Sequence, residues 1–230
     1  MTNTKDIAKL HEYESEDIFD IIEKLERSFH IKFKNDAFYY VKTFGDFCDV
    51  VEDHIKLEHR DDCTTQQAFY KLRDAIAATQ QIDPAAIMPA TKLADIFPAH
   101  NRRQKTKEFM VRVGIDMNLL TYPDWLATTF TIGMLLSLVA FFVDWRIAIA
   151  DLAFFIVAFI IAGKLGKDLS IPTVRQLTEK LSKEYYIDAR RVKGTVNRKE
   201  ILNIITETFC DDLAMDKAYL TRHDKFSWAS

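Results

Sequence analysis

The densest group of reactive side chains in the sequence is the run DHIKLEHRDDC, residues 53–63. It brings together carboxylates, imidazoles and a thiol, the groups that bind transition-metal ions in proteins. However, His54 and His59 are five residues apart, whereas two ligands on one helix face are three or four apart. The spacing therefore favours a solvated charged surface over a metal site.

Motifs for catalysis are missing from the sequence. It has no Gly-x-Ser-x-Gly elbow that would expose a nucleophilic serine and no glycine-rich loop that would hold phosphates. With six glycines, the chain is poorly supplied for such loops. Because no set of acid, base and nucleophile can be named, we expect a non-enzymatic protein. A small membrane enzyme is the disfavoured alternative.

Charge and cysteine usage narrow the choice of partners and compartment. The formal net charge is −3, which lacks the dominant basic surface that nucleic-acid binding requires. Cys48, Cys63 and Cys210 are odd in number and have no paired spacing for zinc or disulfides. The sequence predicts a reducing compartment and no nucleic-acid partner.

The centre of the chain is strongly apolar. Residues 125–143 and 147–163 are nearly free of charge, and Asp144, Trp145 and Arg146 separate them. At ~1.5 Å per helical residue, each run is about long enough for a hydrocarbon layer of ~30 Å. We therefore expect a transmembrane helical hairpin over 125–163. The alternative, a buried hairpin of a helical protein, fits less well because both helices are apolar on all faces.

Both flanks of the apolar centre are basic. This distribution predicts a multi-pass protein of the cytoplasmic (inner) membrane with both termini in the cytoplasm. The same side chains are candidates for binding anionic headgroups of membrane lipids, although a plain topology signal explains them equally well. They are Arg102, Arg103, Lys105, Lys107, Lys164 and Lys167.

Small residues recur within the apolar centre. Thr129, Gly133 and Ser137 fall on one face of the first helix, and Ala158 and Ala162 fall on one face of the second. Small side chains let helix backbones approach closely. We expect an intramolecular seam here, with a homodimer face as the open alternative.

The N-terminal flank has the pattern of short amphipathic helices. Apolar residues recur at helical spacing from Asp17, from Thr43 and from Thr64, and the two threonines have N-capping character. Helices of this length need partners to be stable. The pattern predicts an all-α domain in which Phe29, Phe47, Phe69, Leu72 and Leu93 share one core.

Several of these segments resemble acyl carrier proteins. DIFDIIEKLERSFHIKF followed by TFGDFCDVVEDHI is similar to the second half of a carrier. AFYKLRDAIAATQQIDPAAIMPATKLADIF is similar to the first half, so the halves stand in swapped order. The C-terminal flank repeats the first-half pattern, because Asp216, Leu220, Asp224 and Phe226 fall at the spacing of Asp83, Ile87, Thr91 and Leu93. In this combination the chain resembles uncharacterised bacterial two-span membrane proteins.

The resemblance implies a site at Ser15. A carrier bears phosphopantetheine on a serine at the start of its second helix, and acidic neighbours dock on basic acyl-transfer enzymes. Glu14 fits the acid before that serine, but Glu16 stands where the pattern has leucine. The competing interpretation is that Ser15 is a helix N-cap. We therefore expect no cofactor, with phosphopantetheine on Ser15 as the alternative.

The sequence thus predicts an all-α protein with cytoplasmic carrier-like modules flanking a transmembrane hairpin. The expected divisions are a carrier-like domain over 1–98, a basic linker over 99–124, the hairpin over 125–163 and a helical region with a carrier-like half over 164–230. The predicted function is a membrane-anchored adaptor or scaffold that binds a cytoplasmic protein partner. The alternative is a genuine acyl carrier for lipid or polyketide-type synthesis.

Overall fold

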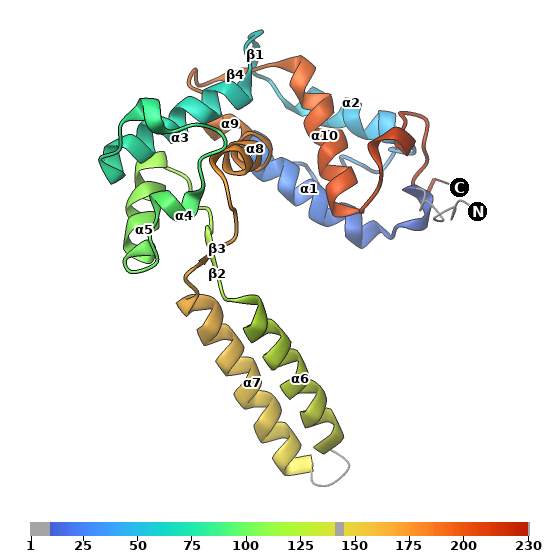
Figure 1. Ribbon diagram of the computed structural model, residues 1–230. Coiled ribbons are helices and arrows are strands. Elements are labelled where there is room, and N and C mark those ends of the chain that lie inside the picture. The colour runs from blue at the N-terminus through green and yellow to red at the C-terminus, as the bar shows by residue number, and fades with distance from the viewer. Residues whose placement is uncertain (1–9, 141–144, 230) are drawn as a thin grey trace, which may run out of the picture. The chain divides into compact units, whose positions relative to one another are not determined.

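The computed structural model describes residues 10–140 and 145–229 and is helical almost throughout (Figure 1). Its only extended pairings within these ranges are short. β1 (Glu58–His59) pairs in parallel with β4 (Thr195–Val196), and β2 (Leu120–Thr121) pairs antiparallel with β3 (Asp168–Leu169). The all-α class predicted from the sequence is confirmed.

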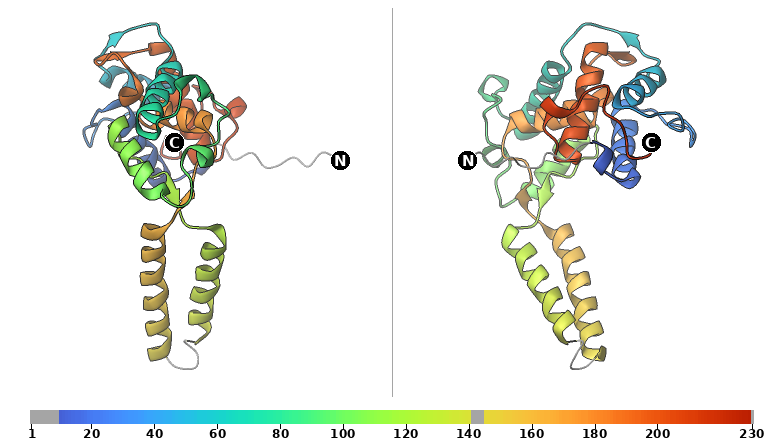
Figure 2. Two further views of the ribbon diagram at one scale, coloured as in Figure 1. Left: turned by 60° about the vertical axis from the view of Figure 1, so that its left-hand side comes forward. Right: turned by 90° about the vertical axis from the view of Figure 1, so that its right-hand side faces the viewer.

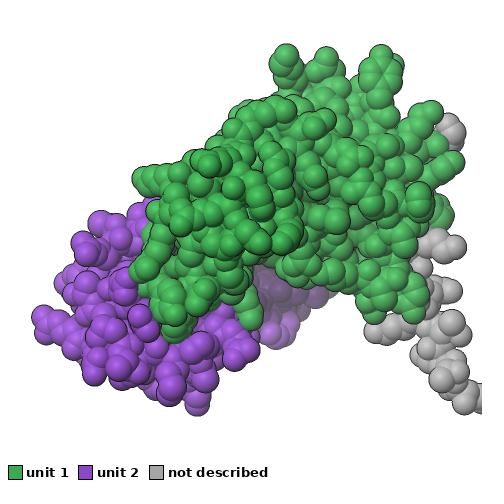
Figure 3. Space-filling view, turned by 90° about the horizontal axis from the view of Figure 1, so that it is seen from above, with its two compact units in different colours: residues 1–71, 177–230 green, residues 72–176 purple. Residues whose placement is uncertain are grey.

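The chain divides into two compact units, residues 1–71 with 177–230 and residues 72–176 (Figure 3). The elements of unit 1 are η1 (Leu10–Glu12), α1 (Ser15–Phe29), α2 (Phe44–His54), β1, the start of α3 (Thr64–Gln80), the end of α8 (Val174–Glu184), α9 (Tyr186–Ala189), β4, α10 (Arg198–Asp212) and η3 (Lys217–Tyr219). The elements of unit 2 are the rest of α3, η2 (Pro84–Ala86), α4 (Leu93–Ile96), α5 (Arg102–Val113), β2, α6 (Asp124–Ala140), α7 (Trp145–Leu165), β3 and the start of α8.

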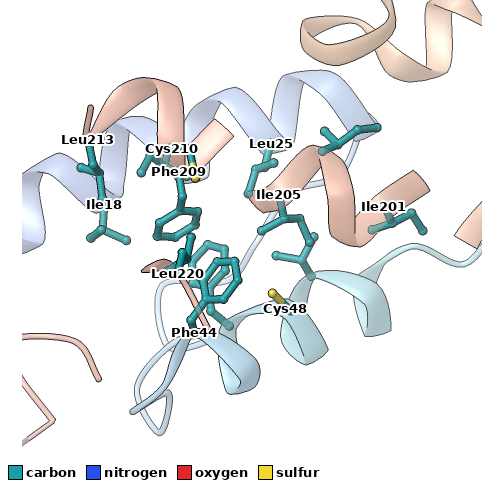
Figure 4. Close-up of a cluster of buried hydrophobic side chains, with 14 of the residues drawn as sticks. Ile18, Leu25, Phe44, Cys48, Ile201, Ile205, Phe209, Cys210, Leu213 and Leu220 are labelled. Carbon is teal, nitrogen blue, oxygen red and sulfur yellow. The ribbon is translucent and has the colours of Figure 1, made fainter. Parts of the chain in front are cut away.

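The core of unit 1 combines the two ends of the chain. Apolar side chains of α1 and α2 pack against those of α10 (Figure 4). The ring of Phe209 in α10 lies 5.0 Å from the rings of both Phe44 and Phe47. All three side chains are almost fully buried. The apolar faces of α1 and α2 therefore pack against the C-terminal flank.

In unit 1, backbone hydrogen bonds join residues 42–45, at the start of α2, to residues 222–226. We call this set of bonds the backbone exchange. Thr43 and Lys225 form an antiparallel bridge, and the Thr43 hydroxyl accepts the N–H of Asp46 at 3.1 Å to cap the helix. The exchanged bonds run from Phe44 N–H to Asp224 C=O at 2.8 Å, from Gly45 N–H to Arg222 C=O at 2.8 Å and from Phe226 N–H to Lys42 C=O at 3.1 Å.

Unit 2 contains the same exchange at the start of α8. Here Lys92 and Thr173 form the bridge. The bonds run from Val174 N–H to Thr91 C=O at 3.0 Å, from Arg175 N–H to Pro89 C=O at 2.8 Å and from Leu93 N–H to Pro172 C=O at 2.9 Å. Each donor and acceptor matches its counterpart in unit 1 in order and spacing.

The segments that lead into the two exchanges also correspond. α10 is followed by Ala214 at φ 49°, and α3 is followed by Gln81 at φ 57°. A short 3-10 turn comes next in both, capped by Asp216 or Asp83, whose carboxylate accepts a backbone N–H at 2.9 Å. The repeat inferred from residue spacing is thus confirmed by geometry.

The pairing of the halves differs from the one expected. Phe29 and Phe47 belong to the core of unit 1, whereas Leu72 and Leu93 belong to unit 2. The expectation that they share one core over residues 17–98 is wrong. The chain carries two first-half segments of the same pattern, and local sequence does not show which of them completes α1 and α2. The expected linker over 99–124 also contains a regular helix, α5.

The apolar centre forms two adjacent antiparallel helices, α6 and α7 (Figures 1 and 2). Gly133 and Ser137 are buried in their contact, and a Cβ at Gly133 would lie 2.3 Å from the Phe155 ring. Thr129 is exposed instead. The predicted seam of small residues therefore holds for two of its three members on α6. The predicted turn residue Asp144 lies outside the described residues.

The predicted location in the inner membrane is wrong. Within 10–140 and 145–229, no helix combines the length and the apolar character that crossing a membrane demands. The described part of α6 has 17 residues, about 26 Å at ~1.5 Å per residue, against a hydrocarbon core of ~30 Å. α7 is longer, but its sequence includes Arg146, Asp151 and Lys164. Local apolarity alone led to the prediction of two spans.

Replacing Phe209 with alanine should destabilise unit 1 by ~3–5 kcal/mol, the usual cost of removing a buried phenylalanine. The ring is fully buried between α2 and the rest of the core. Denaturant unfolding of the full chain, followed by circular dichroism, measures the loss. Tyr40→Ala is the matched control, because Tyr40 is 86% exposed and its loss should be near neutral. Equal stability of the two variants would contradict the docking of α10 on α2.

Candidate functional site

Ser15 lies at the first position of α1, and Glu14 before it is the N-cap. The backbone N–H of Glu14 donates to the Asp17 carboxylate at 3.2 Å, as in a capping box. Ser15 itself is exposed. The interpretation of Ser15 as the N-cap is therefore wrong by one residue, because a glutamate fills the cap position that serine usually occupies.

A cavity of 220 Å³ opens beside Ser15. Four segments build it: α1, the turn before α2, α2 itself and the C-terminal segment. Its lining is apolar or aromatic apart from Ser15 and Asn35. The lining residues are Ser15, Ile18, Phe19, Ile22, Asn35, Phe38, Tyr39, Phe47 and Trp228.

Aromatic contacts hold the walls of this cavity in place. Phe38 stacks on Phe47 with ring centroids 4.8 Å apart, and Phe47 packs on the buried Phe209. Trp228, also in the lining, stacks on Phe226 at 4.5 Å, and its indole N–H donates to the Val41 carbonyl at 2.9 Å. The cavity is thus built on the core of unit 1.

The surface around the cavity mouth is acidic. Five exposed side chains of α1 and its N-cap are carboxylates, and the positive end of the helix dipole favours those in the first turn. They are Glu14, Glu16, Asp17, Asp20 and Glu23. Such a surface attracts a basic protein partner by electrostatic complementarity.

The cavity does not supply an activated nucleophile. Within the described chain, none of its lining residues is a histidine, a lysine or a carboxylate. An unassisted serine hydroxyl is a weak nucleophile. The arrangement therefore suits binding of an apolar group, or attachment of a group to Ser15 by a separate enzyme, better than catalysis.

Two of the six basic residues predicted to bind lipid headgroups have structural roles in unit 2. The Arg102 side chain donates to the carbonyls of Phe97 and Lys167, both at 2.7 Å, and Arg103 donates to the Gly166 carbonyl at 3.2 Å. Lys105 is half-buried, whereas Lys107 and Lys167 are exposed, and the side chain of Lys164 lies outside the described part. The two arginines thus anchor the chain just after α7.

The side chains of residues 53–63 point to different partners. His54 contacts the Val50 carbonyl at 2.7 Å, Asp61 pairs with Lys199 at 3.0 Å, and Asp62 pairs with Arg190. His59 accepts the Arg198 N–H at 3.3 Å. Among the described residues, no three or more His, Cys, Asp or Glu side chains lie where they could together hold a metal ion.

Sequence reasoning missed a buried polar cluster around Arg190. Its guanidinium is 1% exposed and pairs with Asp62; it also donates to Thr64 at 2.6 Å and to Thr195 at 3.1 Å. Tyr186 donates to Glu200 at 2.9 Å, and burial raises the pKa of its phenol. These contacts join the segments that follow β1 and α9. A single arginine in a polar stretch gave no signal of this.

The walls of the Ser15 cavity were also missed in part. Phe47 was assigned to the core, but Phe38, Tyr39 and Trp228 were not singled out. Their only signal was their aromatic character near predicted helix ends. Trp228 comes from the far end of the chain, so its contribution depends on a pairing that spacing along the sequence does not reveal.

The three cysteines should differ in reactivity. Cys48 and Cys210 are buried and Cys63 is exposed, and burial raises the pKa of Cys48 to about 12. Because the thiolate is the reactive form, we expect fast alkylation of Cys63 alone at about pH 8. Peptide mapping after iodoacetamide treatment checks this, and Cys63→Ser should remove the fast reaction. Labelling of Cys48 as fast as Cys63 in folded protein would show that the core is open.

Comparison of the chain with protein-family models, curated proteins and solved structures found no match. The resemblance to acyl carrier proteins therefore rests on the residues of the chain alone and stays a prediction. Any function has to be inferred from the site itself.

Proposed function

We propose that the protein is a non-enzymatic, carrier-like adaptor whose unit 1 holds a short apolar chain in the cavity beside Ser15. The observation that carries this proposal is the 220 Å³ apolar cavity at the start of α1. Small-molecule sites usually measure ~300–1,000 Å³, so the occupant is a slender group such as a medium-length acyl chain. Burying such a chain contributes roughly 0.8 kcal/mol per CH₂ group.

The acidic side of α1 is the proposed contact for a protein partner. Glu16, Asp20 and Glu23 are exposed on it, and Asn35 at the cavity offers a polar group to the head of a bound chain. A partner with a basic surface would meet the acids and the cavity mouth together. Acyl-transfer enzymes are the partner class that the resemblance to carriers suggests.

One observation favours the alternative of a genuine acyl carrier. Ser15 is exposed, lies at the cavity mouth and is not the cap of α1. Its hydroxyl therefore does not have to stabilise the helix. Against this stands Glu16, which places a charge where the carrier pattern has an apolar side chain.

Titration with octanoyl-pantetheine tests the cavity. We expect saturable binding at one site per chain by isothermal titration calorimetry. Ile22→Trp should fill the cavity and weaken binding at least about tenfold, or ~1.4 kcal/mol, because Ile22 is a half-buried lining residue. Leu202→Trp, at a 36% exposed position on α10, is the control and should bind normally. No binding to the wild type, or equal binding by Ile22→Trp, would refute the proposal.

Intact mass after coexpression with a phosphopantetheinyl transferase distinguishes the adaptor from the carrier. We expect no added mass, because Glu16 disfavours recognition by the transferase. Ser15→Ala should also leave stability nearly unchanged, since a lost cap would cost ~0.5–2 kcal/mol and Glu14 is the cap here.

Ser170→Ala is the matched control for this experiment, because Ser170 is an exposed serine in unit 2. An increment the size of phosphopantetheine that is present in the wild type and in Ser170→Ala but absent in Ser15→Ala would favour the carrier and overturn the adaptor.

A further inference from the structure

Unit 2 contains a separate apolar groove at the root of the α6–α7 hairpin. Its volume is 530 Å³, within the ~300–1,000 Å³ typical of small-molecule sites. The helices meet the β2–β3 pair at this end, as Figure 2 shows. The lining residues are Tyr122, Pro123, Leu126, Ala158, Ile161, Ala162, Gly166, Lys167 and Asp168.

Close backbone contacts fix the shape of the groove. Gly166 is buried, and a Cβ on it would lie 2.3 Å from the Thr121 carbonyl oxygen. Only glycine allows the two chains to cross at that distance. Arg102 and Arg103 hold the same crossing through the carbonyls of Lys167 and Gly166. The Tyr122 ring packs edge-on against Phe159 with centroids 5.3 Å apart.

Basic side chains lie near one end of the groove. Arg102, Arg103 and Lys167 converge on the segment after α7, and a guanidinium that donates to a carbonyl keeps its charge. Asp168, next to Lys167 in the lining, carries a negative charge. Asp124 and Lys164, whose side chains lie outside the described part, carry opposite formal charges. The start of α6 and the end of α7 meet here, so their dipole charges of about half a unit each cancel.

We propose that this groove binds a long-chain fatty acid anion. Its hydrocarbon chain would lie along Leu126, Ala158 and Ala162, and its carboxylate would meet the Lys167 ammonium and the positive field of the two arginines. A neutral chain gains nothing from this charge. A single chain fits the volume of the groove and continues onto the exposed apolar surface of α7, where Ile160 is 52% and Ile161 is 49% exposed.

Calorimetric titration of the full chain with palmitate, below its aggregation concentration, tests this site. We expect one-site binding, with cetyl alcohol at least about tenfold weaker, or ~1.4 kcal/mol. Ala162→Leu should abolish binding by filling the groove, whereas Ala150→Leu makes the same change at an exposed position of α7 and should have no effect. Lys167→Gln should weaken binding of palmitate but not of cetyl alcohol, and Lys107→Gln is the matched charge control.

The variants also separate this site from the cavity beside Ser15. Ile22→Trp should leave palmitate binding intact, and Ala162→Leu should leave octanoyl-pantetheine binding intact, so either site can fail alone. Palmitate binding that is lost in Ile22→Trp but kept in Ala162→Leu would overturn the groove. Equal affinity for palmitate and cetyl alcohol would overturn the role of charge. A change of sedimentation coefficient in Ala162→Leu without a loss of palmitate binding would assign the groove to a contact between two copies, and would also overturn it.

Discussion

The backbone exchange between residues 42–45 and 222–226 is the constraint on which unit 1 depends. It joins the start of α2 to the segment after η3, and it thereby places the Phe209 and Phe226 rings against Phe47. Buried backbone groups must be paired, so this register cannot shift without losing several hydrogen bonds together. The cavity beside Ser15 is a consequence, because Trp228 becomes one of its walls only when the exchange is in place.

The same exchange occurs in unit 2, but what surrounds it is different. In unit 1 the helix before the exchange is α1, which ends in a left-handed residue at His30 and begins at the cavity. In unit 2 the corresponding helix is α5, which ends in a left-handed residue at Gly114, and its first side chains, Arg102 and Arg103, fix the root of the hairpin. The same backbone exchange and preceding helix thus lie beside a cavity in unit 1 and beside the α6–α7 hairpin in unit 2.

Much of the local structure could be predicted from the sequence. Helical periodicity located α1, α2 and α3, and residue spacing located the repeated turns at Asp83 and Asp216. Each of these is decided by side chains a few residues apart. The cap of α1 was misplaced by one residue because Glu14 and Ser15 can both fill that position. The membrane spans were inferred from mean apolarity, which shows neither where a helix ends nor what lies beside it.

Pairing over long distances could not be predicted. Two first-half segments compete for α1 and α2, and both offer apolar residues at the same spacing; the choice of α10 depends on complementary packing of Phe209 with Phe44 and Phe47. The burial of Arg190 depends likewise on Asp62 and Thr64, which are far from it in sequence. Charge and helix propensity are properties of single residues, whereas these contacts depend on which two residues meet in the folded chain.

The position of the cavity has a thermodynamic consequence for the proposed adaptor. Its walls come from α1 and α2 at one end of the chain and from Trp228 at the other, so a bound chain contacts both and binds only when they are docked. A ligand that binds only the folded form adds about 2.7 kcal/mol of stability at 100 times its dissociation constant. Burial of the ligand and closure of unit 1 are therefore coupled. A partner that withdraws the bound chain would loosen the contact between the two ends, which gives the adaptor a physical difference between its loaded and empty states.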